Sequence, residues 1–246
     1  MRTVSIACAL ALTLFTACGR DANPGGSEGA EGGTPGVSEA GERIGPLGPV
    51  PVPAENPMTE AKVALGHQLF FDARLSVDGS RSCYSCHQNQ NGNGGAEPKA
   101  IGAADRQLTR HSPVIWNVAF MPRFYWDGRS GSLEAQAKGA WGGGNMGVGA
   151  DNLDAKAAEI GAVPGYAEQF AAVFGDRGAT AETVAEAIAS YERTLICDAT
   201  RYDQYMAGDD SALTEAEQAG LLVFQGKAGC VSCHTAPYFT DGLIHD

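Results

Sequence analysis

The sequence is short of basic residues. It has 17 lysines and arginines against 29 aspartates and glutamates, which gives a net charge of −12. Because a nucleic-acid-binding protein needs a basic surface to meet the phosphate backbone, this balance argues against a nucleic-acid partner. An acidic chain can attract a basic protein partner by long-range electrostatics. The alternative is that the negative charge only keeps the protein soluble.

The sequence also lacks a hydrophobic run long enough to span a bilayer as a mature helix. Its apolar stretch Val4–Phe15 follows Arg2 and runs into Thr-Ala-Cys, an arrangement that resembles a bacterial lipobox. We therefore expect residues 1–18 to be a lipoprotein signal peptide, with Cys18 as the lipidated residue. An ordinary secretory signal cut near Ala17 is the alternative. Either signal exports the mature protein, which we expect in the periplasm; acyl chains on Cys18 would anchor it to a membrane.

Aromatic residues are absent from residues 19–57, where Gly, Ser, Glu and Pro dominate. Such a segment cannot bury enough apolar surface to offset the entropy lost on ordering. We expect it to be a flexible tether, stiffer in its proline-rich second half.

Strand-like alternation is scarce from residue 58 onward, and apolar residues recur at helical spacing instead. Thr214 and Glu217 form a capping-box pattern, and Gly226 is a stop signal just before the last cysteines. The sequence therefore predicts an all-α fold. The expected helices cover residues 58–72, 132–139, 151–161, 165–175, 180–196 and 214–226.

Four of the seven cysteines occur in two copies of one pattern, C-x-x-C-H. The copies are Cys83–His87 and Cys230–His234, while Cys197 stands alone. This order is the attachment signature of c-type haem: two thiols bind the porphyrin and the histidine behind them ligates iron. A disulfide would leave the two histidines unexplained, and a zinc site needs four ligands where the motifs offer six. The sequence thus predicts two covalently bound haem c groups.

Seven stretches between about residues 58 and 239 form a recognisable series. In chain order they are "ALGHQLFFDARLSVDGSRSCYSCH", "RHSPVIWNVAF", "FYWDGRSGSLEAQAKG", "VPGYAEQF", "AIASYERTLI", "DQYMAG" and "GLLVFQGKAGCVSCH". In these stretches and their order the chain resembles the di-haem bacterial cytochrome c peroxidases, a family that includes MauG-like enzymes. The resemblance implies two c-type cytochrome domains, here 58–198 and 199–246, with the second incomplete because the chain stops at Asp246.

The resemblance also implies how the two haems divide the work. The first would reduce hydrogen peroxide, and the second would receive electrons from a small periplasmic carrier, a c-type cytochrome or a cupredoxin. The first haem would be held by Cys83, Cys86 and His87 and the second by Cys230, Cys233 and His234, with the two histidines as iron ligands. A calcium site between the domains and a homodimer are compatible with the same resemblance.

Three further residues gain roles from the resemblance. Trp126 matches a tryptophan that helps electrons cross between the haems, with a plain core aromatic as the alternative. Gln136 matches a glutamine of the distal pocket, and a solvated helix residue is its alternative. Arg129 is expected either to pair with haem propionates or to cap a turn with Asp127.

Two positions depart from the better-known family members. Ala103 stands where many members carry a histidine that blocks the first iron, so we expect an open iron or another ligand; His111 is the nearest candidate, although a structural role is favoured for it. Asn145 precedes Met146 where the family has a glutamate. An asparagine can hydrogen-bond peroxide but cannot carry its proton.

These observations favour a di-haem peroxidase. Asn145 supports the alternative of a di-haem electron-transfer protein without efficient peroxide cleavage. A MauG-like oxidase that acts on a protein side chain is the third hypothesis.

Overall fold

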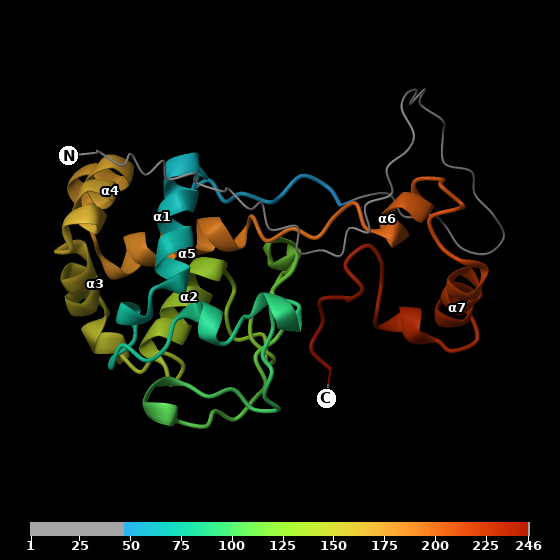
Figure 1. Cartoon of the computed structure of the whole chain (residues 1–246), viewed down its shortest axis with the longest axis horizontal. Coiled ribbons are helices and arrows are strands. Elements are labelled where there is room, and N and C mark those ends of the chain that lie inside the picture. The colour runs from blue at the N-terminus through green and yellow to red at the C-terminus, as the bar shows by residue number, and fades with distance from the viewer. Residues whose placement is uncertain (1–46, 246) are drawn as a thin grey trace, which may run out of the picture.

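The computed structural model describes residues 47–245, and these are helical: they contain isolated β-bridges but no regular strand. The all-α prediction is therefore confirmed. The signal peptide and residues 19–46 of the predicted tether lie outside the described residues. The α-helices are α1 (Glu60–Phe71), α2 (Leu133–Gly142), α3 (Leu153–Gly161), α4 (Pro164–Phe174), α5 (Ala181–Glu192), α6 (Arg201–Met206) and α7 (Glu215–Gln225) (Figure 1).

Helices α1, α2, α5, α6 and α7 begin at residues whose side chains cap them. Ser132 accepts a hydrogen bond from the backbone N–H of Ala135, and Thr214 and Glu217 form the predicted capping box. Helix α6 is absent from the prediction based on periodicity, because six residues are too few to show a helical repeat.

The core of the N-terminal unit, residues 56–197, is built on the crossing of α1 and α5 (Figure 1). Leu65 and Leu69 of α1 and Val184 of α5 are each 0% exposed. Gly66 permits the crossing, because a Cβ atom there would lie 1.9 Å from the carbonyl oxygen of Ala187. Helices α2, α3 and α4 pack around this pair and complete the hydrophobic cluster.

The end of the predicted tether joins this unit. Residues 47–58 have no regular helix, yet Asn56 is 2% exposed and its side-chain amide donates to Glu134 Oε1 at 2.7 Å and to the carbonyl of Glu186 at 2.9 Å. Lys62 donates back to Asn56 Oδ1 and to the carbonyl of Pro57. Ordered packing thus begins at Asn56.

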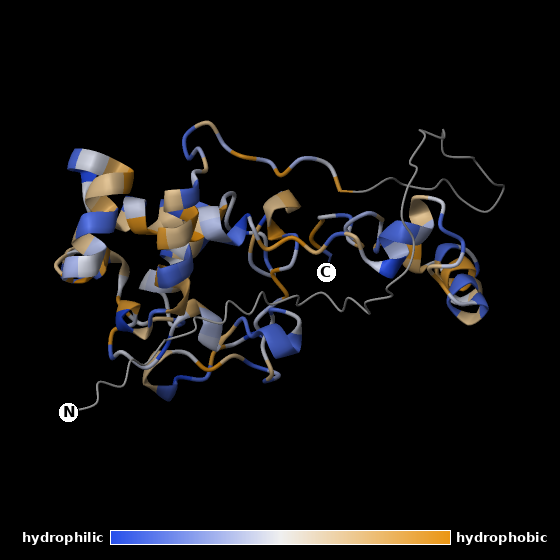
Figure 2. Cartoon of the chain, turned by 45° about the horizontal axis from the view of Figure 1, so that its top comes forward, coloured by the Kyte–Doolittle hydropathy of each residue, from blue (hydrophilic) through white to orange (hydrophobic). Residues whose placement is uncertain are grey.

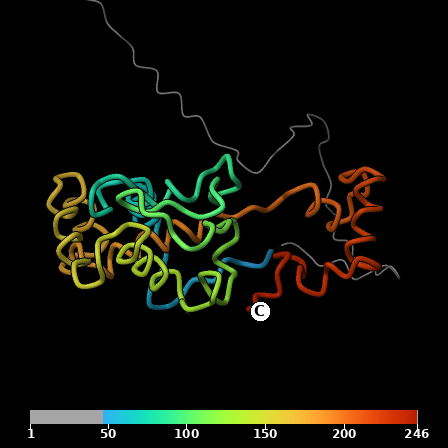
Figure 3. Tube along the Cα trace, turned by 90° about the horizontal axis from the view of Figure 1, so that it is seen from below, coloured from blue at the N-terminus to red at the C-terminus, as the bar shows by residue number. Residues whose placement is uncertain are grey.

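The C-terminal unit, residues 201–245, holds α6, α7 and the second C-x-x-C-H motif. The chain reaches it through an extended segment after α5, and its last residues return toward the N-terminal unit (Figure 3). There the ring of Phe120 stacks on that of Tyr238, with centroids 4.9 Å apart. Helix α7 buries none of its residues, and its apolar side chains Leu222 and Val223 are exposed. Figure 2 colours the chain by hydropathy and shows hydrophobic residues on the helices of both units. Within residues 47–245, no helix is both long and apolar enough to cross a membrane.

Candidate functional site

The two C-x-x-C-H motifs fold in the same way. In each, the first cysteine begins a 3₁₀ turn and the second caps its C-terminal end; the turns are η2 (Cys83–Ser85) in the N-terminal unit and η8 (Cys230–Ser232) in the C-terminal unit. In each, the histidine N–H donates to the carbonyl of the first cysteine, at 3.1 Å for His87 and 2.9 Å for His234. In the first motif, both cysteines and the histidine line one pocket.

The histidine of each motif is oriented by one ring nitrogen. His87 Nδ1 lies 3.2 Å from the carbonyl oxygen of Asn93, and His234 Nδ1 lies 3.0 Å from that of Phe239. Since a carbonyl can only accept, Nδ1 carries the proton and Nε2 is left with its lone pair, as an iron ligand requires. Burial lowers the pKa of His87, which keeps this imidazole neutral. Both motifs therefore fit covalent haem with a histidine ligand.

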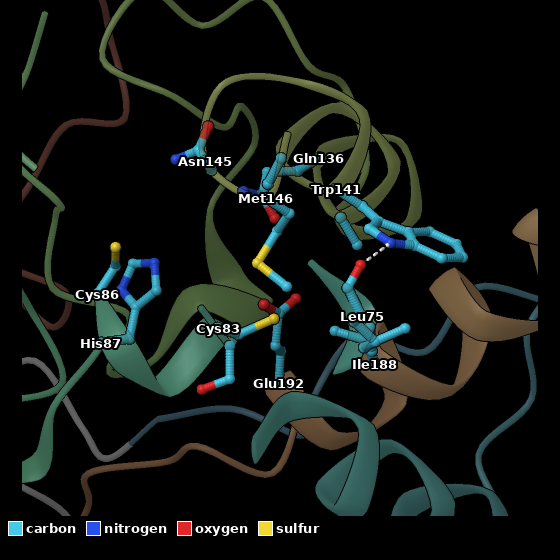
Figure 4. A pocket seen from close by; sticks show the side chains of 13 residues that line it. Leu75, Cys83, Cys86, His87, Gln136, Trp141, Asn145, Met146, Ile188 and Glu192 are labelled. Carbon is cyan, nitrogen blue, oxygen red and sulfur yellow. Dashed lines mark hydrogen bonds between the residues drawn. The ribbon is translucent and has the colours of Figure 1, made fainter. Parts of the chain in front are cut away.

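A pocket opens directly beside the first motif, and the two cysteines and the histidine of that motif line it. Apolar side chains form much of its wall, with a few polar groups between them (Figure 4). The lining residues are Leu75, Ser82, Cys83, Cys86, His87, Gln136, Ala137, Ala140, Trp141, Asn145, Met146, Ile188 and Glu192.

Helix α2 and the loop after it supply the wall that contains Gln136, Asn145 and Met146 (Figure 4). Trp141 fixes the helix, because its buried indole Nε1 donates to the carbonyl of Leu75 at 2.8 Å. The loop is held by a bond from the N–H of Ala103 to the carbonyl of Asn145 at 2.9 Å. The structure therefore brings Gln136 and Asn145 to the same pocket as Cys83, Cys86 and His87, far from them in sequence.

No second imidazole enters this pocket among the described residues: His87 is the one histidine in its lining. Ala103 is buried and lies next to Gly147. His111 is outside the lining, and its Nδ1 bonds the carbonyl of Glu97 at 2.7 Å. This contact agrees with a structural role for His111.

One acidic residue lines the pocket, and the sequence analysis missed it. Glu192 is 7% exposed, and its Oε2 has no hydrogen-bond partner. Burial raises the pKa of this carboxyl to about 8. Its position carried a signal, because Glu192 continues the i, i+4 spacing of Val184 and Ile188 on the buried face of α5. Because burying a carboxyl is costly, a glutamate on the buried face of a helix indicates a role other than packing.

Two other glutamates that lie near the pocket in sequence are used elsewhere. Glu134 pairs with Arg193 at 2.8 Å, and Glu159 pairs with Lys156 at 2.7 Å. Burial acts to raise the pKa of Glu134, but the ion pair with Arg193 and a hydrogen bond from Asn56 hold it below its usual range. Neither carboxyl lines the pocket.

Trp126 and Arg129 lie outside the pocket, on a loop that faces the C-terminal unit. Trp126 is 57% exposed, which rules out the plain core aromatic, and its Nε1 donates to the carbonyl of His111 at 2.8 Å. Arg129 donates to Asp127 Oδ1 at 2.8 Å and lies over the ring of Tyr125. A Cβ atom on the neighbouring Gly128 would come within 2.9 Å of Ile244.

The second motif is more open than the first. Cys233 and His234 are exposed, and the ring of Phe224 lies 6.3 Å from that of His234. Side-chain ligand atoms of Cys233, Asp241 and His245 lie within 4.8 Å of one another. Haem attachment would consume the Cys233 thiol, so we assign no metal to this group. The predicted calcium site stays a prediction.

Comparisons with known proteins agree with this geometry. A family profile described as di-haem cytochrome c peroxidase matches residues 60–211. Cytochrome-c peroxidase IdrP1 of Denitromonas iodatirespirans is 44% identical over 205 residues, which cover 82% of this chain and 54% of that protein. Methylamine utilization protein MauG of Methylorubrum extorquens is 40% identical over 203 residues, covering 80% of this chain and 56% of that protein.

A solved structure supports the same relationship. The crystal structure of a MauG-like protein associated with microbial copper homeostasis matches with a TM-score of 0.74 at 32% sequence identity, covering 81% of this chain and 59% of that one. The chain spans about half the length of the curated relatives that it matches.

Proposed function

This chain belongs to the di-haem cytochrome c peroxidase family, and we propose that it takes part in the reduction of hydrogen peroxide to water with electrons from a small periplasmic carrier. The first motif would hold the haem that meets peroxide, and the second would hold the haem that receives electrons. A reduced c-type cytochrome or a cupredoxin is the proposed class of donor.

The observation that carries the proposal is the pocket at His87. It joins a neutral, oriented imidazole and two attachment thiols to a wall that carries Gln136 and Asn145. A bound haem would supply the redox-active iron at this place. The amides of Gln136 and Asn145 can donate hydrogen bonds to a peroxide oxygen and so hold the substrate in one orientation. Leu75, Ile188 and Trp141 give the pocket an apolar wall.

The test is steady-state consumption of peroxide by the full-length holoprotein with both haems, using a reduced c-type cytochrome as donor. We expect turnover that depends on the donor and is abolished in His87→Gly, which loses the ligand of the first haem. The absorption spectrum of His87→Gly checks the site independently, since an unchanged first-haem spectrum would contradict the assignment. If the wild-type holoprotein consumed no peroxide, the proposal that it is a peroxidase would be rejected.

Asn145 favours a second candidate, a di-haem electron-transfer protein without efficient peroxide cleavage. Its amide stands in the pocket where a proton-carrying carboxylate would be expected. The same assay separates the two candidates: an electron carrier would take electrons from the donor without consuming peroxide. The third candidate is a MauG-like oxidase that acts on a protein side chain, and its support is the sequence similarity to MauG.

The remaining expectations accompany this proposal. Trp126 is proposed as the electron relay between the haems and Arg129 as a partner of a haem propionate. A lipid anchor on Cys18 would hold the protein in the periplasm, and calcium binding and a homodimer are proposed from the family likeness alone.

A further inference from the structure

Glu192 is the buried acid of the pocket at the first motif. It is the last residue of α5, and it shares one helix face with Val184 and Ile188, which are 0% and 4% exposed. Its carboxyl enters the pocket beside Cys83 and Met146 (Figure 4). Solvent therefore reaches little of the side chain, which is 7% exposed.

The surroundings give Oε2 of Glu192 no partner. The charge of the adjacent Arg193 acts to lower the pKa of Glu192, but the Arg193 guanidinium pairs with Glu134 of α2 at 2.8 Å, and burial and the Glu134 charge act in the opposite direction. Other titratable groups around Glu192 are Cys83 on η2, Tyr125 on the loop before α2 and Tyr191 on α5 itself. The Cys83 thiol becomes a thioether once haem is attached, and neither tyrosine supplies a positive charge. A buried carboxyl in such a place is most stable as the neutral acid.

We propose that Glu192 is the proton donor of this pocket, which takes the place of the carboxylate that Asn145 cannot provide; this rests on the proposed function. When the O–O bond of peroxide breaks, two electrons come from the reduced donor and each oxygen gains one proton. Glu192 gives its carboxyl proton to the departing oxygen, which leaves as water, and it regains a proton from solvent. The second proton also comes from solvent.

A neutral carboxylic acid suits this role because proton donation in a dry pocket requires an acid that is still protonated near neutral pH. With the pKa of Glu192 raised to about 8 by burial, the donor form prevails at pH 7. The amides of Gln136 and Asn145 can orient peroxide, but they have no proton to transfer at this pH. The pocket thus divides orientation and proton transfer between different residues.

The test compares wild-type, Glu192→Gln and Glu192→Asp holoproteins with both haems present. The matched control is Glu159→Gln, an exposed carboxyl on α3 outside the pocket. The first readout needs no turnover: the absorption spectrum of the oxidised first haem is recorded between pH 5 and pH 10. We expect a spectral transition near pH 8 in the wild type and the control, its loss in Glu192→Gln, and a shifted transition in Glu192→Asp.

The second readout is the pH profile of peroxide consumption. We expect the wild-type rate to fall as the pH rises through about 8, and Glu192→Gln to lose at least about 100-fold, the usual contribution of a general acid. Partial recovery in Glu192→Asp would separate proton transfer from a purely structural role.

The outcomes distinguish this inference from the proposed function. A spectral transition that persists in Glu192→Gln, or that is missing from the wild type, overturns the inference even if peroxide is consumed well. Peroxide consumption by Glu192→Gln at the wild-type rate and with the wild-type pH profile overturns it too. A wild type that consumes no peroxide rejects both the proposed function and the donor role, while the spectra still decide whether Glu192 titrates beside the haem.

Discussion

At the scale of single residues, two glutamates near Arg193, the half-buried Glu134 and the buried Glu192, have pKa values shifted in opposite directions. The ion pair with Arg193 and a hydrogen bond from Asn56 hold the pKa of Glu134 low, whereas burial without a hydrogen-bond partner for Oε2 raises that of Glu192 to about 8. The residue type is the same, so the difference comes from the depth of burial and from the partners. Each shift leads to a measurable effect on stability.

The raised pKa of Glu192 makes the folded state hold a proton that the unfolded chain releases. The contribution to stability is complete below the unfolded pKa of about 4.3 and is lost as the pH rises through about 8. We expect the free energy of unfolding of the wild-type holoprotein to fall with pH by up to about 1.4 kcal/mol per pH unit more than that of Glu192→Gln. Urea denaturation of both proteins at pH 5 and pH 8 measures this difference, and parallel curves would contradict it.

Glu134 is the partner of a buried arginine, so its loss should be costly. The side chains of Arg193 and Glu134 are 6% and 16% exposed in their ion pair. We expect Glu134→Ala to lower the free energy of unfolding by about 3–5 kcal/mol, because the Arg193 charge stays buried without its counter-ion. The control is Glu182→Ala, which removes an exposed pair with Lys138 and should cost at most about 1 kcal/mol. Equal losses in the two variants would refute the distinction.

At the scale of the elements, the crossing of α1 and α5 positions the pocket. Helix α5 carries Ile188 and Glu192 into the pocket wall, and α1 packs against both α5 and the turn η2 that holds Cys83. The depth of the crossing therefore sets the distance between Glu192 and the first motif. Gly66 controls that depth, because the backbone of Ala187 occupies the space of a side chain.

We expect Gly66→Ala to destabilise the N-terminal unit by about 3 kcal/mol or more, since its new Cβ would lie 1.9 Å from the carbonyl oxygen of Ala187. Gly165→Ala near the start of α4 is the matched control, because nothing lies within 4 Å of its Cβ position. That control should be neutral or stabilising by up to about 1 kcal/mol. Thermal denaturation measures the stability of both variants. If Gly66→Ala were as stable as the control, the prediction would be wrong, because α1 and α5 could then move apart at little cost in free energy.

At the scale of the whole molecule, the two motifs belong to separate units that meet through loops. Tyr238 stacks on Phe120, and Ile244 approaches Gly128, two residues after Trp126. The exposed indole of Trp126 thus stands on the loop that approaches the unit with the second motif. This location suits a relay between two redox groups.

We expect Trp126→Phe to slow electron transfer between the haems severalfold while both haems stay attached. Phenylalanine keeps an aromatic ring but loses the indole and its hydrogen bond to His111. Rapid mixing with a reduced donor, followed at the absorption of each haem, measures the rate. Trp116→Phe, the same change outside the pocket lining, should leave the rate unchanged. A wild-type rate in Trp126→Phe would remove the relay role.

Much of this organisation could be predicted from the sequence because it depends on local patterns. The C-x-x-C-H spacing specifies haem attachment within five residues, and Ser132 and Thr214 mark the starts of α2 and α7 through caps that act within one turn. The all-α class follows in the same way from helical periodicity. Helix α6 was not predicted because its six residues are too few to show helical periodicity.

By itself, then, the sequence predicted haem attachment and determined the helical class, since both are encoded in residues that are neighbours along the chain. Only the tertiary structure decided which polar groups share the first pocket. Glu134 and Glu192 both lie on helices and both are glutamates, yet α5 turns Glu192 into the pocket and Arg193 toward Glu134. The physical reason is that burial and charge pairing depend on long-range contacts between helices, and these set the pKa of a carboxyl.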